Sequence, residues 1–190
     1  MARDPSVQVH PAALCDSDTI GPRTRVWAFA HVMPGAVIGA DCNICDAVFV
    51  EGGASVGDRV VLKNGVMVWD GVTLHDDVFV GPGVTFTNDP TPRAGRSGGP
   101  DEFVPTIVLD GASIGANATI LCGTTIGRSA LVAAGATVTK NVDAHALVAG
   151  TPARAVGWVC ACGQRLDDAL TCRCGRRYQR GEGGLAELES

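Results

Sequence analysis

The stretch IGADCN-ICDAVF-VEGGAS-VGDRVV-L, residues 38–62, decides the fold of this chain because an aliphatic residue recurs at every sixth position. The same spacing runs without a break from Ile20 to Phe86 and returns from Val108 to Val138. A small or β-branched residue stands four places after each of these, as at Cys42. Neither an α-helix, with a period of about 3.6, nor an amphipathic strand, with a period of about 2, gives this pattern.

A six-residue period is typical of a β-solenoid, in which each hexad forms one flat side of a three-sided coil. The larger aliphatic side chain fills the interior, and the smaller residue fits the narrower space near a corner. Gly, Asn and Asp at the corners tolerate the positive φ that tight turns require. Eighteen matching hexads, at three to a coil, predict an all-β parallel helix of about six coils. The alternative is coincidental spacing in an ordinary β domain, and two unbroken runs argue against it.

Length, charge and cysteine content narrow the class of protein. A chain of 190 residues has room for one principal domain and a small appendage. The net charge of −5 and the lack of a basic stripe argue against a nucleic-acid partner. No apolar run reaches the length of a membrane span, and the first residues lack the apolar core of a signal peptide. We therefore expect a cytoplasmic protein whose eight Cys do not form a disulfide framework.

Breaks in the hexad pattern divide the chain into segments. A polar, Pro- and Gly-rich stretch at 88–106 interrupts the hexads and predicts a loop ejected from the coil wall. Long loops in compact domains are usually functional or disordered, and we favour function because charged residues and an aromatic flank the Gly-rich tip. The expected segments are a lead-in at 1–8, a β-helix at 9–156, a Cys-rich appendage at 157–178 and a disordered tail at 179–190.

Two matched Cys-x-Cys-Gly motifs stand in the appendage, with their thiols at Cys160, Cys162, Cys172 and Cys174. Four thiolates in two pairs are the ligand set of a structural tetrahedral zinc. The usual spacing leaves two to four residues between paired ligands, whereas only one separates them here. Redox-active or merely exposed pairs remain the alternative. So short a segment cannot bury a core of its own, so the predicted zinc supplies its folding energy.

The 18-residue repeat predicts which polar residues meet on the surface. Residues 18 apart lie one coil apart on the same side, about 4.8 Å away across the sheet. Asp70 and Asn88 have this separation, and each follows an interior aliphatic by two places, so both side chains are expected to point outward at one corner. We predict a polar site there. A pair of turn residues, selected for corner dihedrals, is the alternative interpretation.

Aromatic residues at outward positions predict an interface. Trp27, Phe29 and Trp69 face outward by the hexad count, and we infer a homo-oligomer. His31 is a conceivable general base, but it lies three coils from Asn88, about 14 Å away. It reaches that site only from a neighbouring subunit, and a His that makes a hydrogen bond at an interface is an equal alternative.

At this point the motifs resemble a known family. The hexads and the segment Gly150-Thr151-Pro152-Ala153-Arg154 resemble the left-handed parallel β-helix acyltransferases, a fold that departs from the usual right-handed crossover. Further motifs are similar to those of the nucleotide-linked 3-amino-sugar N-acetyltransferases; they lie at residues 26–32, 86–89, 92–93, 105–106, 111–120 and 157–159.

The resemblance implies a homotrimer with active sites between adjacent β-helices, acetyl-CoA along the C-terminal coils and a nucleotide-linked amino sugar near the middle ones. It implies that Asn88 contacts the reacting amine, and we expect Asp70 to accept a hydrogen bond or the proton. The expected substrate-binding residues are Lys63, Asn64, Trp69, Arg93 and Glu102. The expected cofactor-binding residues are Ala116, Ala133 and Ala134 along the pantetheine and Lys140 and Arg154 near the CoA phosphates.

The expected function is N-acylation by direct attack of a neutral sugar amine on an acyl-CoA thioester. Two departures leave the sugar open: Lys63-Asn64-Gly65 stands where the family often has Gln-Asn-Asn, and Val104 replaces a basic or bulky residue. The acceptor could instead be serine or a free hexose, and the β-helix could be a non-catalytic scaffold. A metal-dependent hydratase needs closely spaced His residues, which this chain lacks.

Overall fold

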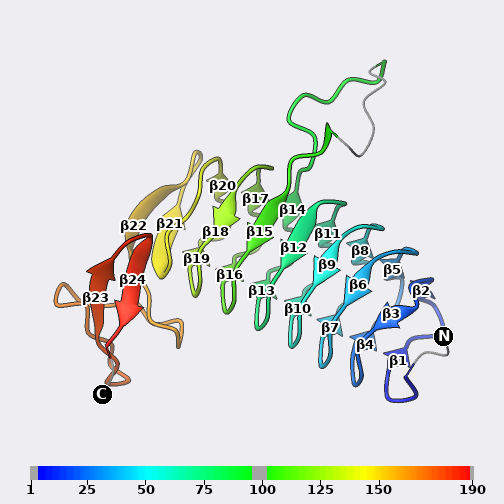
Figure 1. The fold of residues 1–190 in the computed structure, drawn as a ribbon, viewed down its shortest axis with the longest axis horizontal. Helices are drawn as coiled ribbons and strands as arrows, with labels where there is room; N and C mark the ends of the chain where they lie inside the picture. The colour runs from blue at the N-terminus through cyan, green and yellow to red at the C-terminus, as the bar shows by residue number, and fades with distance from the viewer. Residues whose placement is uncertain (1–3, 96–101, 189–190) are drawn as a thin grey trace.

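The predicted all-β parallel helix is confirmed in the computed structural model, which describes residues 4–95 and 102–188. The coils stack side by side along the long axis of the molecule, with the N-terminus at one end and strands β21 to β24 at the other (Figure 1). The described residues contain no helix long and apolar enough to cross a membrane.

Three parallel sheets form the walls of the solenoid. Wall A consists of β1 (Gln8–Val9), β4 (Arg25–Val26), β7 (Asn43–Ile44), β10 (Val61–Leu62), β13 (Phe79–Val80), β16 (Ser113–Ile114), β19 (Leu131–Val132), β21 (Ala146–Ala149) and the antiparallel β22 (Arg154–Trp158). Wall B consists of β2 (Leu14–Cys15), β5 (His31–Val32), β8 (Phe49–Val50), β11 (Met67–Val68), β14 (Thr85–Phe86), β17 (Thr119–Ile120) and β20 (Thr137–Val138). Wall C consists of β3 (Thr19–Ile20), β6 (Val37–Ile38), β9 (Ser55–Val56), β12 (Val72–Leu74), β15 (Thr106–Val108) and β18 (Thr125–Ile126).

The solenoid has more coils than the sequence count predicts. Wall A holds eight parallel strands from β1 to β21, so the expected number of about six is an underestimate. The extra rungs come from the imperfect hexads before Ile20 and from Ala146–Ala149, where the spacing is irregular. Strand β1 starts at Gln8, which places the last residue of the predicted lead-in within the first rung.

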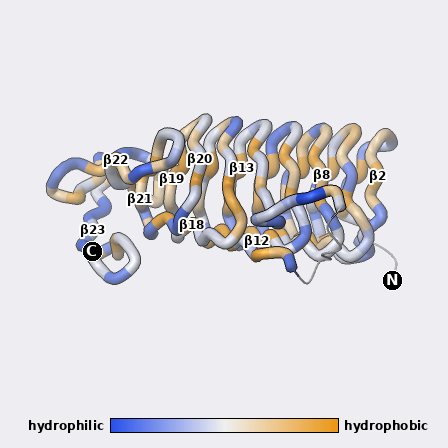
Figure 2. The backbone as a smooth tube through the Cα atoms, turned by 90° about the horizontal axis from the view of Figure 1, so that it is seen from above, coloured by the Kyte–Doolittle hydropathy of each residue, from blue (hydrophilic) through white to orange (hydrophobic). Residues whose placement is uncertain are grey.

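The interior is as dry as the hexad pattern predicts. Every large aliphatic of the two runs is buried, and Phe86 is the largest of the side chains that are fully buried. The smaller partners four places on are buried too, including Cys42, which packs rather than reacts. Hydrophobic and hydrophilic segments alternate along the coils (Figure 2). Burial of this continuous apolar column is what holds coils of such short strands together.

The corners turn through residues with positive φ, one in each hexad. This position falls on Gly in half of the turns, but it also falls on Arg23, Phe29, Ala47 and Arg59, which the expectation of Gly, Asn or Asp did not include. Gly residues directly after the interior aliphatic have a different role. A Cβ at Gly115 would lie 2.5 Å from the backbone N of Ala134, so Gly there allows close approach of the next coil.

The predicted loop leaves the coil between β14 and β15 and projects away from the solenoid (Figure 1). Wall pairing continues across it as if it were absent, because Thr85 pairs with Thr119 and Val80 with Ile114. The loop is closed at its neck, where the Val104 NH donates to the Asn88 carbonyl at 2.9 Å. Thr106, the last residue of the predicted loop, belongs to β15, and residues 96–101 lie outside the described part of the chain.

A C-terminal cap follows the last coil, and we use this name for residues 157–188. After the cis bond between Thr151 and Pro152, β22 pairs antiparallel with β21 and covers the open edge of wall A. The cap has its own small core of Cys160, Leu166, Cys172, Tyr178 and Leu185, and Trp158 contacts both this core and that of the solenoid.

The expectation of a disordered tail at 179–190 is wrong for the described residues. Strands β23 (Tyr178–Gly181) and β24 (Gly184–Glu187) form an antiparallel hairpin. Gly184 forms a parallel bridge with Ala144, and the Ala144 NH donates to the Gly183 carbonyl at 2.8 Å, which attaches the hairpin to the solenoid. The Gly/Glu-rich composition suggests disorder, but Gly183 supplies the positive φ of a tight turn and Leu185 supplies a buried anchor.

Candidate functional site

Asp70 and Asn88 lie on consecutive coils at the corner between walls B and C. The Asn88 side-chain amide donates to the Asp70 carbonyl oxygen at 3.3 Å, so the predicted adjacency of the two residues is confirmed. The loop neck also reaches this corner, because the Asn88 carbonyl accepts from Val104 and the Gly71 carbonyl accepts from Thr106. A carboxylate and a carboxamide therefore stand together at the foot of the loop.

Sequence analysis missed Glu51, which lies at the same corner one coil earlier. Its Oε2 accepts a hydrogen bond from the Asp70 NH at 2.9 Å. The sequence could have indicated this position, because Glu51 precedes Trp69 by one 18-residue repeat. The repeat therefore places Glu51 beside Trp69, next to Asp70. Asp70 and Asn88 are half-buried, and so is Glu51.

The Asp70 carboxylate differs from those of Asp58 and Asp76, which also stand two places after an interior aliphatic. Asp58 Oδ1 accepts from the Ala40 NH at 2.7 Å, and Asp76 Oδ1 accepts from the Asp58 NH at 2.9 Å, so these two side chains serve the turns. Within the described part of the chain, the Asp70 carboxylate accepts no hydrogen bond of this kind. It occupies the space beside Gly53, where an added Cβ would lie 2.1 Å from Asp70 Oδ1. Its oxygen atoms are therefore available to a ligand.

A row of rings runs along wall B toward this corner. The Trp69 and Phe49 rings are 5.3 Å apart, and the Phe49 and His31 rings are 5.5 Å apart. His31 also lies 3.6 Å from Asp16, and wall pairing places it three coils from the level of Asn88, as predicted. Trp69 is partly buried and packs on the solenoid core, so it is less exposed than the outward position predicts.

The remaining predicted substrate residues are spread over the surface of one chain. Lys63 and Asn64 lie at the corner between walls A and B, at the opposite end of wall B from Asp70. Arg93 is exposed in the loop and donates to the Pro92 carbonyl at 2.8 Å. Glu102 is exposed near the returning end of the loop. Within one chain, Lys63 and Asn64 are therefore apart from Asp70.

The predicted pantetheine path coincides with another corner column. Ala116 and Ala134 lie one repeat apart, and the Gly135 NH donates to the Ala116 carbonyl at 2.8 Å. Within the described residues, the NH groups of Ala116 and Ala134 make no hydrogen bond with the protein, which leaves them free for amide carbonyls of a cofactor. The Ala133 NH is not free, because it donates to Val148 at 2.8 Å.

The two predicted phosphate-binding residues are exposed at the C-terminal end of the solenoid. Arg154 opens β22, and its guanidinium donates to the Ala153 carbonyl at 2.8 Å. The Ala153 NH in turn donates to the Thr137 carbonyl at 2.8 Å. This hydrogen bond ties the start of β22 to strand β20 of wall B, and Lys140 follows Thr137 by three residues. Both cations are thus at the end of the molecule where the sequence predicts the cofactor to lie.

The four Cys of the cap gather as predicted, with all four Sγ atoms within 4.8 Å of one another. Three of their separations are 3.6 Å for Cys160–Cys174, 3.6 Å for Cys162–Cys172 and 3.7 Å for Cys162–Cys174. A tetrahedral zinc with Zn–S bonds of about 2.3 Å requires S–S separations of about 3.8 Å. The donor set and its size therefore fit a zinc ion.

The surroundings of the thiols also favour a cation. Burial alone would raise the pKa of Cys160, but hydrogen bonds from the Cys162 NH and the Tyr178 hydroxyl lower it to about 6. At Cys172 a hydrogen bond from the Cys174 NH lowers the pKa, but burial and the neighbouring thiols outweigh it and raise the pKa. A positive ion between the thiols would favour the ionised form of Cys172, which its neighbours disfavour.

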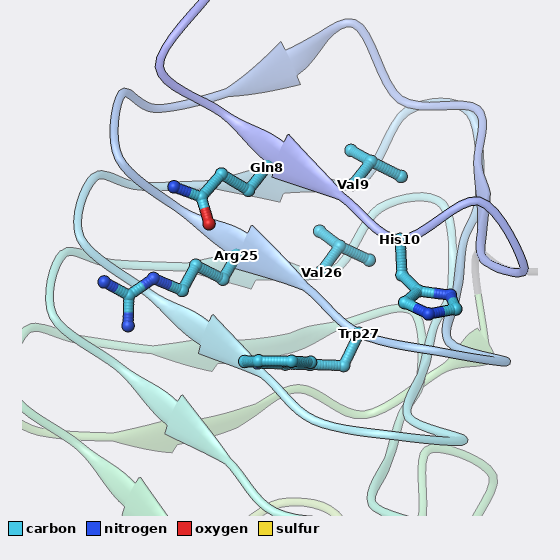
Figure 3. A pocket seen from close by; sticks show the side chains of 6 residues that line it. All are labelled: Gln8, Val9, His10, Arg25, Val26 and Trp27. Atoms are coloured by element: carbon cyan, nitrogen blue, oxygen red, sulfur yellow. The ribbon is translucent and has the colours of Figure 1, made fainter.

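A separate hollow lies on wall A near the N-terminus. It measures about 170 Å³ and is lined by Gln8, Val9, His10, Arg25, Val26 and Trp27, as Figure 3 shows. Trp27 is 44% exposed and its indole NH donates to Asn43 at 2.7 Å, while Phe29 is 74% exposed. Exposed aromatic residues of this size are typical of interfaces, so the expected association of subunits stays a prediction.

Comparisons with known proteins agree with this geometry. The family model described as "Hexapeptide repeat of succinyl-transferase" matches residues 35–70 and 105–140. A dTDP-3-amino-3,6-dideoxy-alpha-D-galactopyranose 3-N-acetyltransferase from Aneurinibacillus thermoaerophilus is 46% identical over 183 residues, which are 95% of this chain and 94% of that protein.

Solved structures show the same fold. A hexapeptide-repeat acetyltransferase from Vibrio cholerae, crystallised with acetyl-coenzyme A, is 26% identical with a TM-score of 0.57, covering 66% of this chain and 72% of that one. A putative acetyltransferase from Bacillus cereus is 20% identical, also with a TM-score of 0.57, covering 82% and 79%. The chain belongs to the hexapeptide-repeat acyltransferases and, among them, groups with the nucleotide-linked 3-amino-sugar N-acetyltransferases.

Proposed function

We propose that this protein transfers the acetyl group of acetyl-CoA to the 3-amino group of a dTDP-linked 3-amino-3,6-dideoxy sugar. The observation that carries the proposal is the full-length similarity to the enzyme from A. thermoaerophilus, together with the Asp70–Asn88 pair at the foot of the loop. The acetyl-CoA complex of the related V. cholerae protein supports the choice of cofactor.

The reaction needs positioning more than a strong base. The lone pair of the neutral amine attacks the thioester carbonyl carbon, a C–N bond forms, and the C–S bond then breaks to release CoA as a thiolate. The amine loses one proton, which passes to Asp70 and then to the thiolate, so the products are the acetamido sugar and CoA thiol. Holding the two reactants in line is the main contribution of the protein.

The corner residues divide this work between them. Asn88 orients the amine through its side-chain oxygen, because its Nδ2 already donates to the Asp70 carbonyl. The Asp70 carboxylate, which serves no turn NH in the described residues, accepts the amine hydrogen bond. Free NH groups in the column of Ala116 and Ala134 bind the pantetheine amides. A backbone NH that holds the developing oxyanion contributes about 2.7–4 kcal/mol in other acyl transfers.

Assembly as a homotrimer completes the site in this proposal. Lys63, Asn64 and His31 lie far from Asp70 within one chain, and a neighbouring β-helix can bring such residues to it. The exposed Trp27 and Phe29 favour burial against another copy. Light scattering coupled to gel filtration should give three times the 19.5 kDa chain mass, and a monomeric, fully active protein would contradict this assembly.

The cap binds one structural zinc per chain in this proposal. Cys160, Cys162, Cys172 and Cys174 hold it, and its positive charge stabilises the Cys172 thiolate, whose pKa the neighbouring thiols raise. Elemental analysis of purified protein should give about one zinc per chain. Cys172→Ser removes a ligand and should lower that content, whereas Cys122→Ser, outside the cluster, should not. Equal metal content in both variants would contradict the assignment.

A thiol-release assay tests the function. We expect turnover with acetyl-CoA and a dTDP-linked 3-amino sugar, and little with serine or a free hexose. Asn88→Ala should lower kcat at least about tenfold while the circular dichroism spectrum and Tm stay near those of the wild type. A wild-type rate in this variant would show that Asn88 is not part of the active site. Preference for serine or hexose would favour the alternative acceptors, and calorimetry without CoA binding would favour a scaffold.

A further inference from the structure

The backbone NH groups at several corners of this solenoid are bound by carboxylates rather than by the neighbouring coil. Ala40 and Asp58 donate in this way to Asp58 and Asp76, and in each case the acceptor stands exactly one repeat later in the same column. Corner NH groups need such partners because the turn directs them away from the sheet ladder. One oxygen of each of these carboxylates therefore holds a turn, and the other oxygen of Asp76 accepts from Arg59 at 3.2 Å.

The corner at Asp70 follows a different arrangement. Its NH is bound by Glu51, which belongs to the preceding coil and to the neighbouring column. The Asp70 carbonyl is bound from the following coil by the Asn88 side chain at 3.3 Å. The backbone of Asp70 is thus held from both sides, at its NH by one coil and at its carbonyl by the next.

The consequence concerns the Asp70 side chain. At the other corners the acceptor stands one repeat later, which for the Asp70 NH would be the side chain of Asn88. Glu51 takes that place, so the Asn88 amide binds the Asp70 carbonyl instead. Neither hydrogen bond uses the Asp70 carboxylate. It lies where Gly53 has no Cβ, and among described residues no donor bonds to it. A carboxylate with a fixed backbone and free oxygens is arranged to accept a hydrogen bond from a ligand.

We propose that Glu51 is a positioning residue for the acyl transfer: it fixes the Asp70 backbone so that the Asp70 carboxylate meets the amino group of the acceptor. This inference rests on the proposed function. In this proposal Glu51 acts through Asp70, because its Oε2 is engaged with the Asp70 NH. The hydrogen bond from an NH to a carboxylate is charge-assisted, but a carboxamide oxygen also accepts it.

Three variants test the proposal by steady-state kinetics. Glu51→Ala removes the acceptor and should lower kcat at least about tenfold, with the KM for acetyl-CoA within about twofold of wild type, because misplacement at a distance from the chemistry is costly. Glu51→Gln keeps an acceptor oxygen and should retain at least about a third of the wild-type kcat. Asp58→Ala removes an equivalent corner acceptor away from the site and should lower Tm with kcat within about twofold of wild type.

Two kinetic outcomes would overturn the inference. Wild-type kcat in Glu51→Ala would show that the hydrogen bond from the Asp70 NH to Glu51 has no effect on turnover. Equal loss in Glu51→Gln and Glu51→Ala would show that the charge of Glu51 acts on the substrate directly.

Crystal structures separate this inference from the function on which it rests. In Glu51→Ala the Asp70 carboxylate should leave the space beside Gly53, whereas in Glu51→Gln it should stay there. An unmoved Asp70 in Glu51→Ala refutes the positioning role, whatever the activity. If Asp70 moves in Glu51→Ala but the wild type acetylates no amino sugar, the positioning of Asp70 by Glu51 is supported and the proposed function is contradicted.

Discussion

Single residues at the corner between walls B and C show how a turn position becomes a candidate site. Asp70 lies at this corner, and Asp58 and Asp76 lie at the corner between walls C and A, each two places after an interior aliphatic. Of these three, only Asp70 has a carboxylate that bonds to no corner NH in the described residues. The 18-residue repeat is enough to predict the meeting of Asp70 and Asn88. It does not predict Glu51, because the reach of a long side chain into the next column is set by rotamer and not by register.

Gly53 gives a prediction at this scale. An Ala side chain there would lie 2.1 Å from Asp70 Oδ1, so Gly53→Ala should displace the carboxylate and lower kcat at least about tenfold. Gly35→Ala is the matched control one coil earlier, since its φ is +84° against +90° for Gly53 and its Cβ would meet nothing closer than 3.8 Å. Both variants should lose on the order of 1–2 kcal/mol of stability from the positive φ. Equal kcat in the two variants would contradict the role of Asp70.

Among the elements, the C-terminal cap departs most from what composition predicts. Its last residues are rich in Gly and Glu, which suggests disorder, but Tyr178 and Leu185 are buried and the turn closes a hairpin. Hexad counting describes the coils well, because each interior position repeats one physical environment. The cap has no repeat, so its fold depends on contacts between residues far apart in sequence, such as Ala144 with Gly184.

The proposed zinc gives a prediction for the stability of the cap. Chelation with EDTA should lower Tm by at least about 5 °C and open residues 157–188 to trypsin, because the small core contains two of the four thiols. Differential scanning calorimetry and limited proteolysis measure the two effects, and added zinc should reverse them. The solenoid should stay resistant under the same conditions. A cap equally resistant with and without chelator would mean that its apolar core alone folds it.

The whole molecule carries a buried titratable group where cap and solenoid meet. His145 is buried, bonds through Nδ1 to the Val159 carbonyl at 3.0 Å and lies 4.8 Å from the Tyr178 ring. Burial lowers the pKa of His145 below its usual value of 6.5; the Val159 carbonyl and Glu187 oppose this shift, and Arg128 adds to it. The protonated form is therefore disfavoured in the folded protein.

The lowered pKa of His145 makes the folded protein less stable as the pH falls. The unfolded chain takes up a proton at His145 at a higher pH than the folded chain does, so stability is fully present above about pH 6.5 and falls as the pH is lowered through the folded pKa. His145→Asn tolerates the positive φ at this position and should flatten the decline of Tm below pH 6.5. Thermal unfolding at a series of pH values checks this, and identical slopes in both proteins would remove His145 from the pH response.

The parallel solenoid itself was predictable, but the number of its coils was not, since the terminal rungs use imperfect hexads such as those at Val9 and Leu14. The proposed arrangement of subunits is likewise beyond one chain's repeat, because Lys63 and Asp70 lie at different corners and would meet only across two chains.

The unbroken pairing of walls on both sides of the loop has a consequence for how such a chain can change. Since β14 and β17 stay in register on either side of the loop, the number of residues between Asn88 and Thr106 does not affect the pairing of the walls. Substitutions, insertions or deletions in that segment can therefore change the loop while the coils beneath it keep their register. If the loop contacts the acceptor, as its position beside Asn88 leads us to expect, selectivity and architecture evolve on separate stretches of one polypeptide.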